Sequence, residues 1–245
     1  MMKKILCCAF LILALLGCKE KESKVIVGTE PTFPPFEYLD KASNEIVGFD
    51  IDLIKAIAAD QGFQVKIKNL GFDGLVPSIE SGNIDIIASG MTITAEREEK
   101  VSFSTAYINA GLALAIRDGD AEINSVDDLQ GKTLGVQIGT TGAIKAEELK
   151  KSGKVGKIVT YNTIDMAMLD LINGGVDAVI NDLPVTKVYV SKQPGKVKIV
   201  GQTLTSESYG FAVSKQNTKL LQKINEGLAN LKANGEYDKL LKKYF

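Results

Sequence analysis

The apolar and polar positions alternate between short strand-like runs and longer segments with helical spacing. Strand-like runs rich in Val and Ile occupy residues 24–29, 63–68, 83–90, 132–139, 157–161 and 176–182. Segments with helical spacing lie between them, at residues 48–62, 72–82, 140–153 and 163–175. The first of these carries one apolar face, formed by Phe49, Leu53, Ile54, Ile57 and Ala58. Strands separated by helices predict βαβ units, and therefore an α/β fold with mainly parallel sheets flanked by helices.

Two segments of the chain resemble each other. Residues 78–90 (SIESGNIDIIASG) and 170–182 (DLINGGVDAVIND) both run from a helix end through a Gly turn and an apolar strand to a polar end. Their aspartates Asp85 and Asp177 align, and we interpret each segment as the last βαβ step of a separate lobe. Ligands bind beyond the carboxyl ends of strands in open α/β sheets, so the two polar ends are expected to meet across a cleft. The alternative is that both are simple turns.

Two segments are suited to cross between the lobes. Residues 101–120 have no helical signal and end in a long apolar run, which predicts a crossing strand, and residues 206–215 predict the returning strand. Residues 217–245 then predict two amphipathic helices that break at Gly235, with one face formed by Leu220, Leu221, Ile224, Leu228 and Leu231.

These crossings define the expected domains. The first lobe comprises residues 25–108 and 209–245 and is therefore discontinuous, and the second lobe comprises residues 109–208. The two crossing strands form the hinge between them.

The first 24 residues have the pattern of a targeting segment. Lys3 and Lys4 precede an apolar run at residues 5–17, which is too short to span a bilayer as a helix. The sequence Leu-Leu-Gly-Cys at residues 15–18 resembles a bacterial lipobox, although its second Leu is bulkier than the residue usually found there. The resemblance implies a lipoprotein signal peptide at residues 1–17 that is cleaved before Cys18, and lipid attached to that cysteine.

The mature protein is then expected to be anchored outside the cytoplasmic membrane. Residues 18–24 are short and charged and are interpreted as the lipidated tether. An ordinary signal peptide with a chance cysteine is the alternative. Cys7 and Cys8 leave with the signal, so the mature chain has no thiol for a disulfide, a metal cluster or a nucleophile.

Composition narrows the function classes. The chain has 245 residues, of which 45% are hydrophobic and 24% charged, and its net charge of −1 gives no basic surface for nucleic acid. His is absent, which removes the usual general base and the usual zinc ligand. No strand is followed by G-x-G-x-x-G, so no dinucleotide site is expected. The sequence therefore predicts neither a cofactor nor a metal.

The ordered set of motifs resembles the bacterial extracellular solute-binding proteins of family 3, the amino-acid-capturing subunits of ABC importers. The matching segments are residues 28–38, 48–58, 72–98, 101–107, 128–142 and 174–184. The resemblance implies a periplasmic-binding-protein fold of type II, with two α/β lobes that close on the ligand about a two-strand hinge. It implies no catalysis. The implied partners are a free amino acid and a membrane permease coupled to an ATPase, and the implied state is a monomer.

An α-amino acid is a zwitterion, so its site needs a cationic clamp for the carboxylate. Arg97 can donate two parallel hydrogen bonds to a carboxylate. Thr92 and Thr141 offer hydroxyl and backbone N–H groups, and Thr141 opens a helix whose N-terminus favours an anion. By the family pattern, Arg97 and Thr92 form the clamp of the first lobe and Thr141 that of the second. The alternative for Arg97 is a surface salt bridge within its glutamate-rich surroundings.

The ligand's ammonium group needs acceptors. Asp182, together with the carbonyl of Gly90, fits this role by the family pattern. The alternative for Asp182 is a helix cap, because Pro184 follows at a first-turn position. The remaining members of this part of the candidate site are Ser89, Met91 and Thr140.

The side-chain pocket is expected at two aromatic residues. Phe33 lies in a proline-rich stretch that predicts a stiff extended loop, and Phe72 is its counterpart, with a plain core role as the alternative. Glu30 aligns with a position where family members carry an acidic residue that meets the far end of the ligand, and Gln137 lies beside the pocket. An acid between aromatic rings favours a cationic tip, so arginine or lysine is the expected ligand. Glutamine or another polar neutral amino acid is the alternative.

Two further classes are weighed against a transport receptor. The first is a dehydratase-like enzyme on the same scaffold, which would have Glu30 as its one obvious acid. The complete zwitterion clamp argues against it, because such an enzyme does not need one. A sensor domain would need a transmembrane helix and a signalling module on the same chain.

Overall fold

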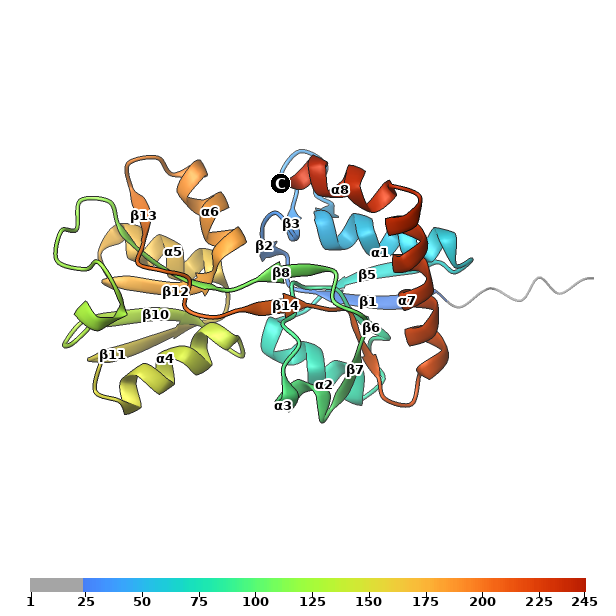
Figure 1. Cartoon of the computed structure of the whole chain (residues 1–245), viewed down its shortest axis with the longest axis horizontal. Helices are drawn as coiled ribbons and strands as arrows, with labels where there is room; N and C mark the ends of the chain where they lie inside the picture. The colour runs from blue at the N-terminus through green and yellow to red at the C-terminus, as the bar shows by residue number, and fades with distance from the viewer. Residues whose placement is uncertain (1–23) are drawn as a thin grey trace, which may run out of the picture.

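The structure is a computed structural model, and residues 24–245 are described here. The predicted signal peptide and most of the tether, including Cys18, lie outside the described residues. Two α/β lobes lie side by side and are joined by two segments that run between them (Figure 1). One sheet has the strand order β5-β1-β6-β15-β7, and the other has the order β11-β10-β12-β9-β13.

The first lobe is built on β1 (Val25–Thr29), β5 (Val65–Asn69), β6 (Ile86–Ile87), β7 (Val101–Phe103) and β15 (Ala212–Ser214). The central strand β1 is parallel to both neighbours, whereas β15 is antiparallel to both of its neighbours. The second lobe repeats this plan with β10 (Thr133–Gln137), β11 (Lys157–Tyr161), β12 (Ala178–Asp182), β9 (Leu112–Arg117) and β13 (Val197–Val200). In each sheet, the one reversed strand is the strand that arrives from the other lobe. The fold is therefore the expected two-lobed α/β architecture.

The hinge consists of β8 (Ile108–Ala110) and β14 (Glu207–Tyr209), which pair antiparallel between the lobes. The domain boundaries expected near residues 108 and 208 fall inside these two strands. Residues of the hinge therefore lie where the lobes meet, a position that gives their side chains access to both.

Helices cover the sheets (Figure 1). Their bounds are α1 (Phe49–Asp60), η1 (Phe72–Gly74), α2 (Leu75–Glu80), α3 (Ala95–Glu98), η2 (Val126–Asp128), α4 (Thr141–Lys151), α5 (Ile164–Asn173), α6 (Leu183–Lys192), α7 (Thr218–Ala233) and α8 (Glu236–Tyr244). The predicted apolar face of α1 is fully buried, and so is that of α7 except for half-buried Leu221. Among the helices of residues 24–245, none is long and apolar enough to cross a bilayer.

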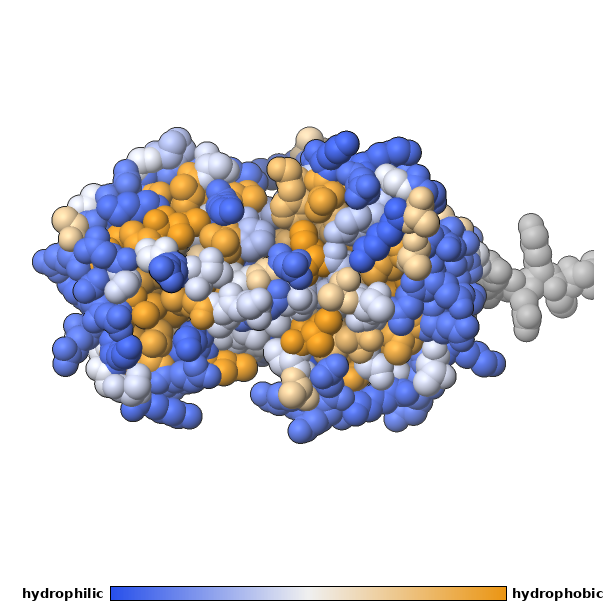
Figure 2. All heavy atoms as spheres, viewed as in Figure 1, coloured by the Kyte–Doolittle hydropathy of each residue, from blue (hydrophilic) through white to orange (hydrophobic). Residues whose placement is uncertain are grey.

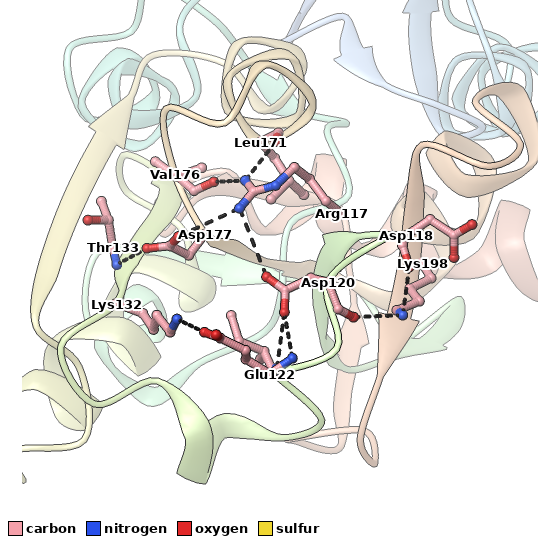
Figure 3. A network of polar contacts seen from close by, with 11 residues as sticks. Arg117, Asp118, Asp120, Glu122, Lys132, Thr133, Leu171, Val176, Asp177 and Lys198 are labelled. Atoms are coloured by element: carbon pink, nitrogen blue, oxygen red, sulfur yellow. Dashed lines mark hydrogen bonds and ion pairs between the residues drawn. The ribbon is translucent and has the colours of Figure 1, made fainter.

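The two similar segments of the sequence play the same structural role. The Asp85 carboxylate accepts a hydrogen bond of 2.7 Å from the Ile26 N–H, and the Asp177 carboxylate accepts one of 2.7 Å from the Thr133 N–H. Both bonds fix the start of a central strand, so that its carboxyl end points to the other lobe. In the second lobe, Arg117 also pairs with Asp177 and donates to neighbouring backbone carbonyls (Figure 3).

The expectation of a purely extended loop around Phe33 is wrong. Two short strands, β2 (Thr32–Phe33) and β3 (Glu37–Leu39), form a hairpin that β4 (Ile46–Val47) extends to three strands. The prolines occupy the turn, where no N–H is needed for pairing. Because Phe33 and Glu37 are paired across the hairpin, their side chains lie on the same face.

Candidate ligand-binding site between the lobes

A small cavity with a volume of about 10 Å³ lies between the lobes. Its wall is formed by Glu30, Phe33, Glu37, Phe72, Gly90, Thr92, Arg97, Gln137, Thr140, Thr141 and Asp182. The structure thus brings together all the predicted site residues except Ser89 and Met91. Contacts between the lobes close the wall, including a hydrogen bond of 3.1 Å from the Gln137 amide to Glu30.

A larger groove of about 630 Å³ also touches both lobes. It runs along the hinge strand β8 and α6, and Lys187 is the one charged side chain in its lining. Figure 2 shows the molecule in the orientation in which β8 and β14 face the viewer, with apolar and polar residues mixed on both lobes. The smaller cavity concentrates the buried charges, so we assign it as the candidate site.

Ser89 and Met91 lie behind the cavity wall. The Ser89 hydroxyl accepts a hydrogen bond of 3.0 Å from the Glu30 N–H and donates one of 3.2 Å to Glu37. Met91 is buried in the apolar cluster of the first lobe. Both residues therefore support the wall without forming its surface.

Arg97 reaches from the first lobe to the second. Its N–H is capped by Thr94 at the start of α3, and its guanidinium donates to the carbonyls of Thr92 at 2.8 Å and Gly139 at 2.9 Å. The guanidinium also lies 5.4 Å from the centre of the Phe72 ring. No described carboxylate forms an ion pair with Arg97 in residues 24–245, so the structure gives no support to the surface salt bridge. Burial lowers the pKa of Arg97, and nearby carboxylates oppose that shift.

Asp182 stands at the N-cap position of α6, but its side chain makes no capping hydrogen bond. One of its oxygens accepts a bond of 2.6 Å from the Tyr209 hydroxyl. Burial raises the pKa of Asp182 to about 7, against the opposing effects of Tyr209 and Arg97. Its carboxyl group is therefore directed to the cavity and the hinge, and the helix-cap interpretation does not describe its contacts.

Two further carboxyl groups line the cavity. Glu30 accepts hydrogen bonds from Thr32 at 2.7 Å and Gln137 at 3.1 Å, and burial raises its pKa. Glu37 is fully buried, and burial followed by the charge of Asp50 raises its pKa well above the usual value. Its Oε2 atom has no hydrogen-bond partner within the described part of the chain. The wall thus carries three carboxyl groups and one guanidinium, an arrangement that favours a cationic ligand.

Asp50 lies behind the cavity wall and holds Gly90, which is part of that wall. The Asp50 carboxylate accepts bonds from the Gly90 N–H at 2.8 Å and the Tyr107 hydroxyl at 2.6 Å, and burial raises its pKa to about 6. Gly90 has a φ of 48°, and a Cβ atom there would lie 2.7 Å from the ring of Phe33. Only glycine therefore lets the Phe33 ring pack against this turn.

The hydroxyls of Thr92 and Thr141 were expected to face the carboxylate of the ligand. Both instead donate to one oxygen of Glu207, at 2.8 and 2.9 Å. Thr140 caps α4 by accepting the N–H of Ala143 at 3.1 Å. The N–H groups of Thr141 and Gly142, also in the first turn of α4, have no intrahelical partner, so they are the donors this end of the cavity retains.

Sequence reasoning missed Glu37, Glu207 and Tyr209. A signal for Glu37 existed in the hairpin, because cross-strand pairing with Phe33 directs it to the same face. A signal for the other two existed in the returning strand, where alternation places residues 207 and 209 on one face.

The fold and the cavity define a two-lobed ligand-binding protein, and comparisons with known proteins agree. The family model of bacterial extracellular solute-binding proteins, family 3, matches residues 25–245, and the chain belongs to this family. An ABC transporter arginine-binding protein 1 of Escherichia coli (strain K12) is 35% identical over 250 residues, covering 100% of this chain and 99% of the relative.

Two solved structures are also similar. An ancestral arginine-binding protein bound to arginine has a TM-score of 0.87 and 44% identity, covering 91% of this chain and 98% of the other. An ancestral arginine-binding protein bound to glutamine has a TM-score of 0.85 and 44% identity, covering 91% of this chain and 97% of the other.

The raised pKa of Asp182 predicts that this residue destabilises the ligand-free fold at alkaline pH. The folded state holds the proton more tightly than the unfolded state, so stability falls as pH rises from the ordinary value of 3.8 through about 7. We expect Asp182→Asn to raise the free energy of unfolding by roughly 4 kcal/mol at pH 8, and by much less near pH 4. Urea unfolding at both pH values measures this, with exposed Asp118→Asn as the control. A loss of stability at pH 8 would show that the buried carboxylate stabilises the fold.

Proposed function

We propose that this protein captures a free basic amino acid, arginine or lysine, and delivers it to an ABC importer. The observation that carries the proposal is the charge of the cavity wall, where one guanidinium faces three buried carboxyl groups. Arg97 and the N–H groups at the start of α4 would bind the α-carboxylate. Asp182, with the carbonyl of Gly90, would bind the α-ammonium.

The charges favour a ligand with a second positive group. A zwitterion uses Arg97 and one carboxylate and leaves Glu30 and Glu37 without a counter-charge. An uncompensated buried charge is costly, and these carboxyl groups accordingly have raised pKa values. A guanidinium or ammonium tip near Glu30, between the rings of Phe33 and Phe72, supplies that counter-charge. The relatives named as arginine-binding proteins support the same ligand class.

Glutamine is the second candidate. The neighbouring Gln137 donates an amide N–H to Glu30, so this end of the cavity also holds a neutral amide group. The similar structure bound to glutamine supports a polar neutral ligand in such a cavity.

The remaining parts of the proposal concern location and action. We propose that the lipobox-like sequence anchors the protein at Cys18 outside the cytoplasmic membrane, and that a monomer acts with a membrane permease. The proposal includes no catalytic step, since the carboxyl groups of the wall are assigned to ligand binding.

A thermal-shift screen over the common amino acids tests the function. A ligand bound only by the folded state raises the melting temperature, and we expect arginine and lysine to give the largest shifts. Arg97→Ala should remove these shifts because it deletes the carboxylate clamp, whereas exposed Lys150→Ala should preserve them. A full response in Arg97→Ala, or a preference for aliphatic or acidic amino acids, contradicts the proposal.

Glu30 is expected to select the ligand's side chain. Charge-assisted hydrogen bonds contribute roughly 1.5–3 kcal/mol, so Glu30→Gln should weaken arginine binding by about 10- to 100-fold. Glutamine binding should change far less, because its amide does not need a negative partner. Calorimetric titration with both ligands measures the difference, with exposed Glu45→Gln as the control. Equal losses for the two ligands would mean that Glu30 only supports the shape of the cavity.

A further inference from the structure

A carboxylate of the hinge connects both lobes at the end of the cavity. Glu207 lies on β14, and its Oε2 atom accepts the hydroxyl hydrogen bonds of Thr92 in the first lobe and Thr141 in the second. Its Oε1 atom accepts a bond of 2.8 Å from the hydroxyl of Thr205. Glu207 does not itself line the cavity, so it acts there through its two threonine partners.

The direction of these bonds follows from elementary chemistry. A carboxylate can only accept hydrogen bonds, and a threonine hydroxyl has one proton to donate. Once that proton is given to Glu207, the hydroxyl can offer only its lone pairs to any other group. The hydroxyls of Thr92 and Thr141 therefore cannot at the same time donate to the carboxylate of a ligand.

Backbone donors remain available for that carboxylate. Thr92 faces Tyr209 in an antiparallel bridge whose two hydrogen bonds come from the N–H groups of Ile93 and Gly210. In this type of pair, the N–H of Thr92 points away from the partner strand. Thr141 is the first residue of α4, where N–H groups have no partner within the helix.

We propose that Glu207 is a positioning residue that fixes the polarity of the site. By accepting the protons of Thr92 and Thr141, it turns both hydroxyls into acceptors toward the cavity. The carboxylate of the ligand is then bound by Arg97 and backbone N–H groups, and the hydroxyl lone pairs are available to its ammonium. This inference rests on the proposed function, because it assumes an α-amino acid as the ligand.

A double-mutant cycle tests whether Glu207 acts through the hydroxyls. Glu207→Leu keeps much of the size of the side chain, but it removes both oxygens that accept the hydroxyl protons. We expect it to weaken arginine binding by about tenfold. In a background with Thr92→Val and Thr141→Val, the same substitution should change binding by less than about twofold, because the groups it acts on are gone. Calorimetric titration gives the four dissociation constants.

The neighbouring residue supplies a matched control. Ser208 points to the opposite side of β14 and donates to Asn109, so Ser208→Ala should leave binding unchanged. A second readout is 5-guanidinopentanoate, which is arginine without its α-ammonium, measured by competition. Glu207→Leu should change its binding by less than about twofold, whereas general damage to the hinge would weaken both ligands equally.

The outcomes separate this inference from the proposed function. Arginine binding by the unmodified protein tests the function, and glutamine replaces arginine in the cycle if the screen selects it. An equal loss in both backgrounds, or no loss from Glu207→Leu in the unmodified background, overturns the inference and leaves the function intact. Absence of binding to every α-amino acid overturns both.

Discussion

The structure depends on the burial of several carboxyl groups around a single guanidinium. Asp182, Glu30 and Glu37 share the cavity wall with Arg97, and burial raises the pKa of each of the three acids. Among the described residues, Arg97 is the one cationic side chain in the lining of this cavity. A positively charged ligand offsets the cost of removing the acids from water. Its attraction to them is strongest when the lobes enclose it and exclude solvent, so binding is then most favourable.

The architecture places these groups from both lobes at one point. Each sheet has the same strand order with one reversed strand, and Asp85 and Asp177 fix the equivalent central strands. The carboxyl ends of the strands then carry Glu30 and Asp182 to the cleft from opposite sides. The hinge contributes as well, because Tyr209 contacts Asp182 and Glu207 contacts a threonine of each lobe. The same strands that join the lobes thus also hold the polar groups of the site.

Much of this could be predicted from the sequence. The buried faces of α1 and α7 follow from helical periodicity, and the two-lobed fold follows from alternating elements and two crossing segments. The ordered motifs also gave nearly all of the residues that line the cavity, since a family pattern records positions along the chain. Residue type and position were sufficient to predict a site residue where the backbone of a motif determines the direction of its side chains.

The rest depends on long-range pairing that no local pattern encodes. The strand expected at residues 83–90 shrinks to Ile86–Ile87, because the residues after it turn into the cleft. Glu37 lies in the cavity wall because it pairs with Phe33 in a hairpin that the sequence did not predict. The hydroxyls of the two clamp threonines point to Glu207, a contact between residues more than 60 positions apart in the chain.

A crystal structure of the protein grown with L-arginine tests the central claim most directly. The account predicts one arginine in the cavity between the lobes, with its carboxylate on Arg97 and the N–H of Thr141, its ammonium on Asp182 and its guanidinium beside Glu30. A ligand bound in the reverse orientation, or bound outside this cavity, would contradict it.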